Sequence, residues 1–162
     1  NKTRRAQIPI RSGFAIGLIG EMAGVLKTPK AKKAKNASAG EDAVCVFHPK
    51  PHMAAGPPQF LNGGILATLA DCHAICTALA TAYRDEARPI GTGDTLWYVT
   101  GNLNIRYTAP VPIGAAVHLR ARVTERAKKK MTVECSITSG DTPCAVAQVL
   151  AIRVPPSWLA NA

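Results

Sequence analysis

The spacing of apolar residues changes from a helical period to a strand period midway along the chain. Between residues 63 and 84, apolar side chains cover most of a helix circumference, at Ile65, Leu66, Leu69, Cys72, Ile75, Cys76, Leu79 and Tyr83. A helix that is apolar nearly all the way round is buried. Asn62 is a good N-cap, because its side-chain oxygen can accept a hydrogen bond from the first turn, and Pro89 ends the segment. The pattern predicts one long core helix.

From residue 95 onward, apolar and polar residues alternate, which is the period of a half-buried strand. The alternation predicts strands near 102–107, 117–124 and 131–138, and then a strand at 143–154 that is apolar on both faces over 145–151. Residues 41–48 predict an earlier strand, and short links at 110–114, 128–130 and 140–142 predict antiparallel hairpins. This order favours an α+β fold, with an antiparallel sheet of about five to six strands wrapped around the helix.

The first 40 residues differ from the rest in charge. Residues 1–35 hold nine Lys or Arg and one acidic residue, Glu21, so most of the net charge of +10 lies there. Helical spacing of Phe14, Leu18 and Met22 predicts a helix at 12–26, followed by a linker at 27–40. We interpret 1–40 as a basic appendage to a domain at 41–162.

The sequence also argues against nucleic-acid binding, a membrane span and an export signal. No aromatic residue lies among the lysines, so nucleic-acid binding is not expected. No run of 18 uninterrupted apolar residues occurs, so a membrane span is not expected. Glu21 interrupts the apolar run near the start, which argues against an export signal.

Cysteine usage indicates a reduced, cytoplasmic protein. The five cysteines, at positions 45, 72, 76, 135 and 144, are odd in number and form no Cys-x-x-Cys motif, which favours buried thiols over disulfides. Cys72, His73 and Cys76 are a weak candidate zinc set, because two neighbours and one residue a turn later converge poorly. We expect no metal or other cofactor, and we expect His73 to be a core residue.

Candidate chemistry lies at the start of the long helix. Gly63 and Gly64 open it, and Asp71 follows Gly64 by seven residues, which is about two turns and nearly the same azimuth. A helix start offers unpaired N–H donors and a positive dipole end. A carbonyl oxygen bound there would be polarised, with a carboxylate further along the same stripe. This layout is typical of acyl transfer or hydrolysis.

The chain resembles the hotdog-fold acyl-CoA thioesterases of the PaaI-like (phenylacetate-degradation) branch over about residues 41–154. The resemblance rests on Phe47-His48-Pro49-x-Pro51-His52, on Gly63-Gly64 with Asp71 seven residues later, and on Asn104-Ile105-x-Tyr107-x-x-Pro110. It implies a hotdog fold and hydrolysis of an acyl-CoA substrate to free acid and CoA. It also implies a homodimer or a homotetramer built as a dimer of dimers.

The resemblance also implies roles for single residues. Asp71 would be the general base or the nucleophile, and the Gly64 amide with Asn62 of the other subunit would hold the thioester oxygen. Asn62 stands where the family usually has histidine, and asparagine cannot gain charge or shuttle a proton. The hydroxyl that positions water in relatives falls on Thr100.

Further candidates for substrate binding lie on both sides of the helix start and on the strands. Gly63, Gln59 and Thr68 are candidates near the helix start. The CoA phosphates need cations, for which the candidates are Arg106, Arg120, Arg122 and Lys128–Lys130. The small side chains of Ala67, Ala70 and Ala74 favour a fairly long or aromatic acyl group.

Two alternatives to thioester hydrolysis stay open. A non-catalytic acyl-CoA-binding module would keep the pocket, with Asp71 in a structural role. A hotdog dehydratase or hydratase would pair an acidic residue with a histidine, which Asn62 replaces here.

Overall fold

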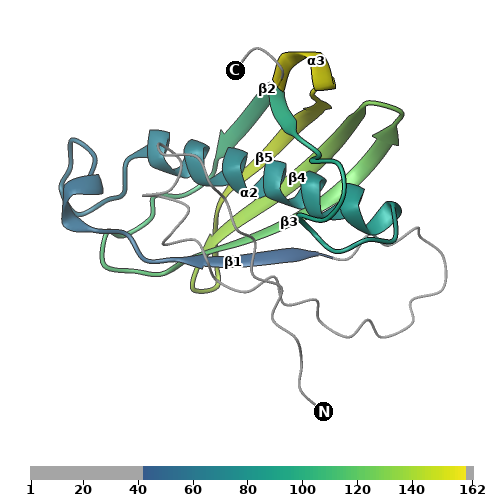
Figure 1. The fold of residues 1–162 in the computed structure, drawn as a ribbon. Coiled ribbons are helices and arrows are strands. Elements are labelled where there is room, and N and C mark those ends of the chain that lie inside the picture. The colour runs from purple at the N-terminus through teal and green to yellow at the C-terminus, as the bar shows by residue number, and fades with distance from the viewer. Residues whose placement is uncertain (1–41, 160–162) are drawn as a thin grey trace, which may run out of the picture.

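One antiparallel sheet curls around one long helix in this computed structural model, which describes residues 42–159 (Figure 1). The elements are β1 (Ala43–Phe47), η1 (Pro51–Met53), α2 (Gly63–Asp85), β2 (Tyr98–Tyr107), β3 (Val117–Ala127), β4 (Lys130–Ser139), β5 (Thr142–Arg153) and α3 (Pro156–Leu159). The α+β class, the first strand, the long helix and the four later strands are confirmed, and the sheet has five strands. The helix expected at 12–26 and the linker at 27–40 lie outside the described residues.

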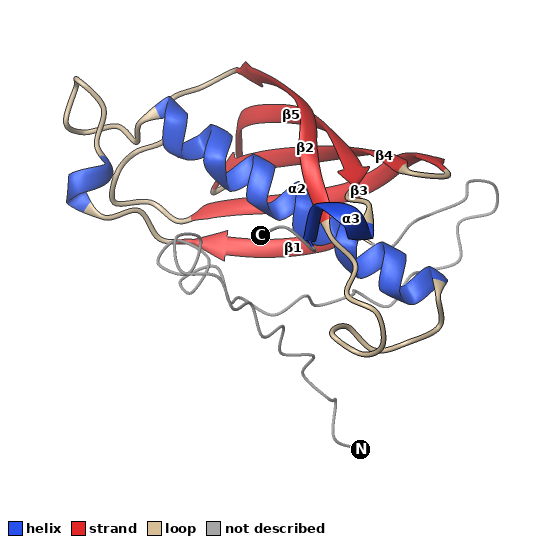
Figure 2. Cartoon of the chain, turned by 45° about the horizontal axis from the view of Figure 1, so that its top comes forward, coloured by secondary structure: helices blue, strands red, loops and turns tan. Residues whose placement is uncertain are grey.

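The strand order is β1-β3-β4-β5-β2, and Figure 2 shows α2 lying along one face of this sheet. The links at 128–129 and 140–141 form the expected hairpins between β3, β4 and β5. The hairpin expected at 110–114 was wrong, because β2 pairs with β5 and not with β3. Strand β5 therefore lies between β4 and β2, and β2 forms an edge of the sheet.

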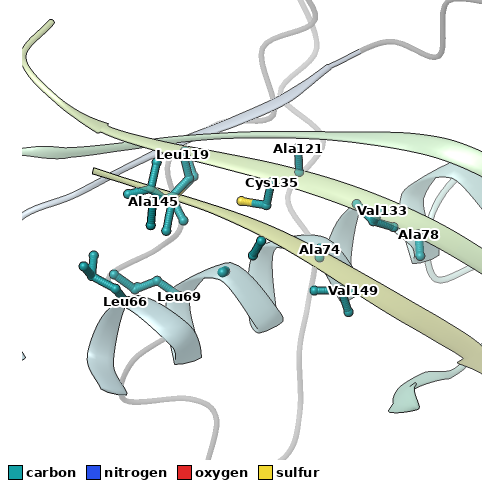
Figure 3. Close-up of a cluster of buried hydrophobic side chains, with 14 of the residues drawn as sticks. Leu66, Leu69, Ala74, Ala78, Leu119, Ala121, Val133, Cys135, Ala145 and Val149 are labelled. Atoms are coloured by element: carbon teal, nitrogen blue, oxygen red, sulfur yellow. The ribbon is translucent and has the colours of Figure 1, made fainter. Parts of the chain in front are cut away.

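Strand alternation builds the core. Side chains from β3, β4 and β5 meet those of α2, and Figure 3 labels Leu66, Leu69, Ala74, Ala78, Leu119, Ala121, Val133, Cys135, Ala145 and Val149. Ala70, Ala74 and Ala78 are wholly buried. Their small side chains therefore serve close helix–sheet packing, which corrects the expectation that Ala70 and Ala74 make room for an acyl group.

By length and composition, the central helix could cross a membrane. However, 56% of its apolar 18-residue stretch is buried inside the fold. Its hydropathy is explained by the sheet that covers it. The other half of its surface includes Gly64, Thr68 and Asp71, which are exposed or half-buried. This open stripe begins where the candidate chemistry was expected.

Candidate active site

The start of α2 is capped by Asn62, as expected. Its side-chain Oδ1 accepts a hydrogen bond of 2.7 Å from the Gly64 amide, and its backbone is extended, as an N-cap requires. The Asn62 carbonyl accepts from the amides of Ile65 and Leu66 at 3.0 and 3.3 Å. The Gly64 N–H expected to bind a thioester oxygen therefore bonds the Asn62 side chain in this structure.

Asp71 lies on the same side of α2 and faces strand β2. The Thr100 hydroxyl donates a hydrogen bond of 2.5 Å to Asp71 Oδ1. Asp71 is half-buried, and none of the ion pairs within residues 42–159 involves it. The structure thus brings together two of the candidate residues, a carboxylate and a neutral hydroxyl that orients it.

A β-bulge at Gly101 aims Thr100 at the helix. Register is lost between Thr100 and Asn102, so Thr100 lies opposite Ala151, and Leu103 lies opposite Val149. Ala151 and Val149 are two residues apart and face the same side of the sheet. The one extra residue in β2 therefore lets Thr100 and Leu103, three positions apart, share the helix-facing side.

The space at the bulge admits only glycine without rearrangement. A Cβ built on Gly101 would lie 2.3 Å from Ile152 Cδ1 and 2.9 Å from Ile152 Cγ1. A larger residue must therefore displace the Ile152 side chain. Bulges are enriched beside active sites because they redirect a side chain in this way.

Tyr107, at the end of β2, is a second contact from this strand to the helix. Its hydroxyl donates a hydrogen bond of 2.7 Å to the Gly63 carbonyl. A Cβ on Gly63 would lie 3.5 Å from the Tyr107 ring, in ordinary contact. The sequence placed Tyr107 in a family motif but not in the site. The alternation of apolar and polar residues in this strand indicated which face Tyr107 occupies. It could not indicate that the side chain contacts the start of the helix.

The remaining candidates near the helix start are on the surface. Thr68 Oγ1 donates to the Gly64 carbonyl at 2.9 Å, one turn before Asp71. Gln59 lies in the loop before the helix, where its carbonyl accepts from the Ile113 amide at 2.9 Å and the residue is exposed. Their roles in binding substrate stay predictions.

The three arginines expected to bind phosphate lie on the side of the sheet away from α2. Arg120 and Arg122 alternate with the buried Leu119 and Ala121 on β3, so they lie on the face of the sheet away from the helix. Both pair with Asp42, and hydrogen bonds from Arg122 and then Arg120 lower the pKa of the Asp42 carboxyl.

Arg106 is exposed on β2 and alternates with Ile105 and Tyr107, which places it on that same outer face. Strands β4 and β5 separate β3 from β2. Within one chain the structure therefore does not bring these arginines to Asp71, and a phosphate-binding role stays a prediction.

His73 on α2 and Cys135 on β4 belong to the core, whereas Cys72 and Cys76 on α2 are half-buried. His73 is buried, and its Nε2 donates to the Ala43 carbonyl at 3.1 Å, which confirms the expected core role. Burial lowers the pKa of His73. Burial raises the pKa of Cys76 to about 11 and that of Cys135 to about 12. These two thiols are protonated near neutral pH and are poor nucleophiles.

Comparison of the sequence with known proteins finds matches to thioesterases. The family model described as "Thioesterase superfamily" matches residues 59–146. The acyl-coenzyme A thioesterase THEM4 of Xenopus laevis is 32% identical over 98 residues, which cover 60% of this chain and 38% of that protein. The chain thus spans well under half the length of this relative.

Solved structures of similar fold include further thioesterases. A thioesterase superfamily protein from Shewanella loihica is 31% identical, with a TM-score of 0.58 over 76% of this chain and 96% of the other. The PaaI protein of the E. coli phenylacetic acid degradation operon is 19% identical, with a TM-score of 0.58 over 70% and 73% of the two chains. The likeness to PaaI concerns the fold alone.

Proposed function

The chain belongs to the thioesterase superfamily, and we propose on that premise that it hydrolyses acyl-CoA thioesters to the free acid and CoA. One observation carries the proposal: Thr100 holds the Asp71 carboxylate on the same side of α2 as its glycine-rich start. The name of the THEM4 relative supports acyl-CoA as the substrate class. The motifs around Gly63 and Asn104 support placement in the PaaI-like branch.

In the proposed reaction the thioester oxygen takes the place of Asn62 Oδ1 at the Gly64 amide. The positive end of the helix and this N–H stabilise the negative charge that develops on the oxygen. Asp71 then accepts a proton from water as the water oxygen attacks the carbonyl carbon. The carbon–sulfur bond breaks, and the CoA thiolate takes that proton. If Asp71 attacks directly, the carbon–sulfur bond breaks, CoA thiolate leaves and a mixed anhydride forms. Water then cleaves the anhydride, which releases the free acid, returns the Asp71 carboxylate and supplies the proton that the thiolate takes up.

We further propose that the working unit is a homodimer formed along β2, with a dimer of dimers as the larger form. Strand β2 has ten residues and pairs only with β5 among the described strands, so its other edge is open. Val99 and Tyr107 on this strand are 40% and 49% exposed. An open edge of this length is a template for a further strand. Pairing there would bring Asp71 of one copy towards Asn62 and Gly64 of its partner.

Substitution of Asp71 tests the proposed reaction. We expect Asp71→Asn to lower kcat for acyl-CoA hydrolysis by roughly 10²- to 10⁴-fold, since a positioned base supplies about that factor, while CoA-ester binding persists. Asp141→Asn is the matched control, because Asp141 is exposed in the turn between β4 and β5. Release of CoA thiol gives the rate for short, medium, long and aryl thioesters.

The same experiment separates the alternatives. A binding module would bind the thioesters, yet the wild type would release no thiol. A hydratase would convert a 2-enoyl-CoA to its 3-hydroxy product without thiol release. Hydrolysis that is unchanged in Asp71→Asn would contradict the proposed role of Asp71.

A further inference from the structure

Two side chains hold opposite ends of a single peptide group at the start of α2. The Gly63 carbonyl and the Gly64 N–H belong to the same peptide unit. Tyr107 donates its hydroxyl proton to that carbonyl at 2.7 Å, and Asn62 Oδ1 accepts from that N–H at 2.7 Å. The three groups form a short hydrogen-bonded chain that passes through the peptide whose N–H faces the expected thioester oxygen.

Such a chain changes the donor strength of the peptide. Hydrogen bonds in series polarise one another, so a donor on the carbonyl makes the N–H of the same unit a stronger donor. Two adjacent glycines also leave their shared peptide freer to rotate than other residues would. The Tyr107 contact limits that rotation, because the ring lies against Gly63 and its hydroxyl fixes the carbonyl direction.

Tyr107 makes a directed contact as well as a packing contact. The residue is 49% exposed in the single chain, and its hydroxyl makes a well-formed bond of 2.7 Å to a helix carbonyl. Tyr107 lies opposite Ala145 and Leu103 opposite Val149. The bulge at Gly101 thus puts Thr100 and Tyr107 on one side of β2, and this strand contacts both the acid and the helix start.

We propose that Tyr107 is a positioning residue for the thioester oxygen. Its hydroxyl orients and polarises the Gly63–Gly64 peptide, so that the Gly64 N–H is a preformed donor. Asn62 Oδ1 occupies this donor until the substrate oxygen replaces it. The inference rests on the proposed function, since it concerns the same site, but it makes a claim about carbonyl recognition that can be measured without turnover.

The test compares Tyr107→Phe with the wild type, with Thr108→Val as the matched control. Thr108 is the next residue, and its hydroxyl donates to the Pro143 carbonyl at 2.8 Å, away from the helix. We expect Tyr107→Phe to lower kcat/KM about tenfold, a fraction of the loss for removing an oxyanion donor outright, with part of that loss in KM. We expect Thr108→Val to keep the wild-type kcat and KM.

Binding of two CoA analogues separates a positioning role for Tyr107 from a merely structural one. One is a ketone, in which CH₂ replaces the thioester sulfur and the carbonyl remains. The other is a thioether without the carbonyl. We expect Tyr107→Phe to weaken ketone binding about tenfold, to leave thioether binding unchanged, and to shift the carbonyl ¹³C resonance of the bound ketone towards its value in water.

The outcomes separate this inference from the proposed function. If the wild type hydrolyses no thioester but Tyr107→Phe selectively weakens the ketone, the proposed function fails and the inference stands. If both analogues weaken equally, if neither responds, or if the wild type does not prefer the ketone to the thioether, the inference is overturned, whatever the hydrolysis assay gives.

Discussion

Thr100 and Asp71, 29 positions apart in the sequence, are joined by a hydrogen bond of 2.5 Å between strand β2 and helix α2. The hydroxyl is the donor, so it stabilises the carboxylate and fixes the direction in which the second oxygen points. This pair ties the sheet edge to the helix at the proposed centre of reaction.

Removal of the Thr100 hydroxyl should slow hydrolysis with little loss of stability. We expect Thr100→Val to lower kcat by roughly 10- to 100-fold, because part of the rate that a positioned base supplies is lost. Thr100→Ser keeps the donor and should stay within about threefold of the wild type. Thiol-release kinetics and urea unfolding check both variants. Equal activity of the valine and serine variants would contradict the orienting role.

The two glycines at the helix start should respond differently to alanine. A Cβ on Gly64 would lie 3.0 Å from Asn62 Oδ1, whereas a Cβ on Gly63 meets only the Tyr107 ring, at 3.5 Å. We expect Gly64→Ala to disturb the cap, at about 1 kcal/mol of unfolding free energy, and to reduce kcat. We expect Gly63→Ala to keep stability or to gain a few tenths of a kcal/mol.

Urea unfolding and steady-state kinetics of these two variants provide the measurement. Each variant is the control for the other, because both add one methyl group in the first turn. A larger stability loss in Gly63→Ala than in Gly64→Ala would show that the Asn62 cap is not the sensitive contact.

The bulge at Gly101 should be coupled to Ile152. We expect Gly101→Ala to lower the free energy of unfolding by about 1–3 kcal/mol, as overpacking does, and to reduce kcat by moving Thr100. In an Ile152→Ala background the added methyl group has room, so its cost should fall below about 1 kcal/mol. A double-mutant cycle in urea measures the coupling. Additive effects would exclude the Ile152 contact as the cause.

Acid should destabilise the fold through His73. Burial lowers the pKa of His73 in the folded chain, so below the unfolded value of about 6.5 the unfolded state binds more protons. The stability contributed by neutral His73 is complete above that pH and is lost as the pH falls below it, by up to about 1.4 kcal/mol per pH unit. We expect His73→Gln to lose less stability between pH 7.5 and 5.5.

Urea titrations at each pH give this comparison. The Asp42 carboxyl, whose pKa is lowered by Arg122 and Arg120, loses its contribution only at lower pH, below about 4. The two effects therefore fall in separate windows. Parallel pH profiles of the wild type and His73→Gln would contradict the role given to His73.

Charge on the open edge of β2 should dissociate the proposed dimer. Val99 on β2 and Val46 on β1 are both 40% exposed, and both lie on edge strands. We expect Val99→Lys to weaken association, since edge lysines oppose strand pairing, and Val46→Lys to leave it unchanged. Sedimentation velocity over a dilution series checks this. A monomeric wild type, or dissociation by the Val46 variant alone, would contradict dimerisation along β2.

The sequence was sufficient to predict the helix, its cap, and the common stripe of Gly64 and Asp71, because these depend on local spacing. The strands were also predictable from alternation, but their order was not. The link at 110–114 has the composition of a hairpin turn, yet the strand before it pairs with β5 and not with β3. Long-range pairing depends on the whole sheet.

The site was predictable only in part for a similar reason. Thr100 was placed from a resemblance, and its contact with Asp71 depends on one extra residue at Gly101, which alternation alone does not reveal. Tyr107 was placed in a family motif and not in the site, although its hydroxyl contacts the Gly63 carbonyl. Arg120 and Arg122 were selected by charge, and their pairing with Asp42 could not be seen from spacing.

The extra residue in β2 also has an evolutionary consequence. Loss of that single codon would turn Thr100 to the opposite surface of the sheet while the hydrophobic ladder beyond it, from Leu103 to Tyr107, stayed in place. A descendant could then lose turnover and keep its architecture. Within such a lineage, the length of β2 at this point would distinguish active members from inactive ones more reliably than retention of Asp71.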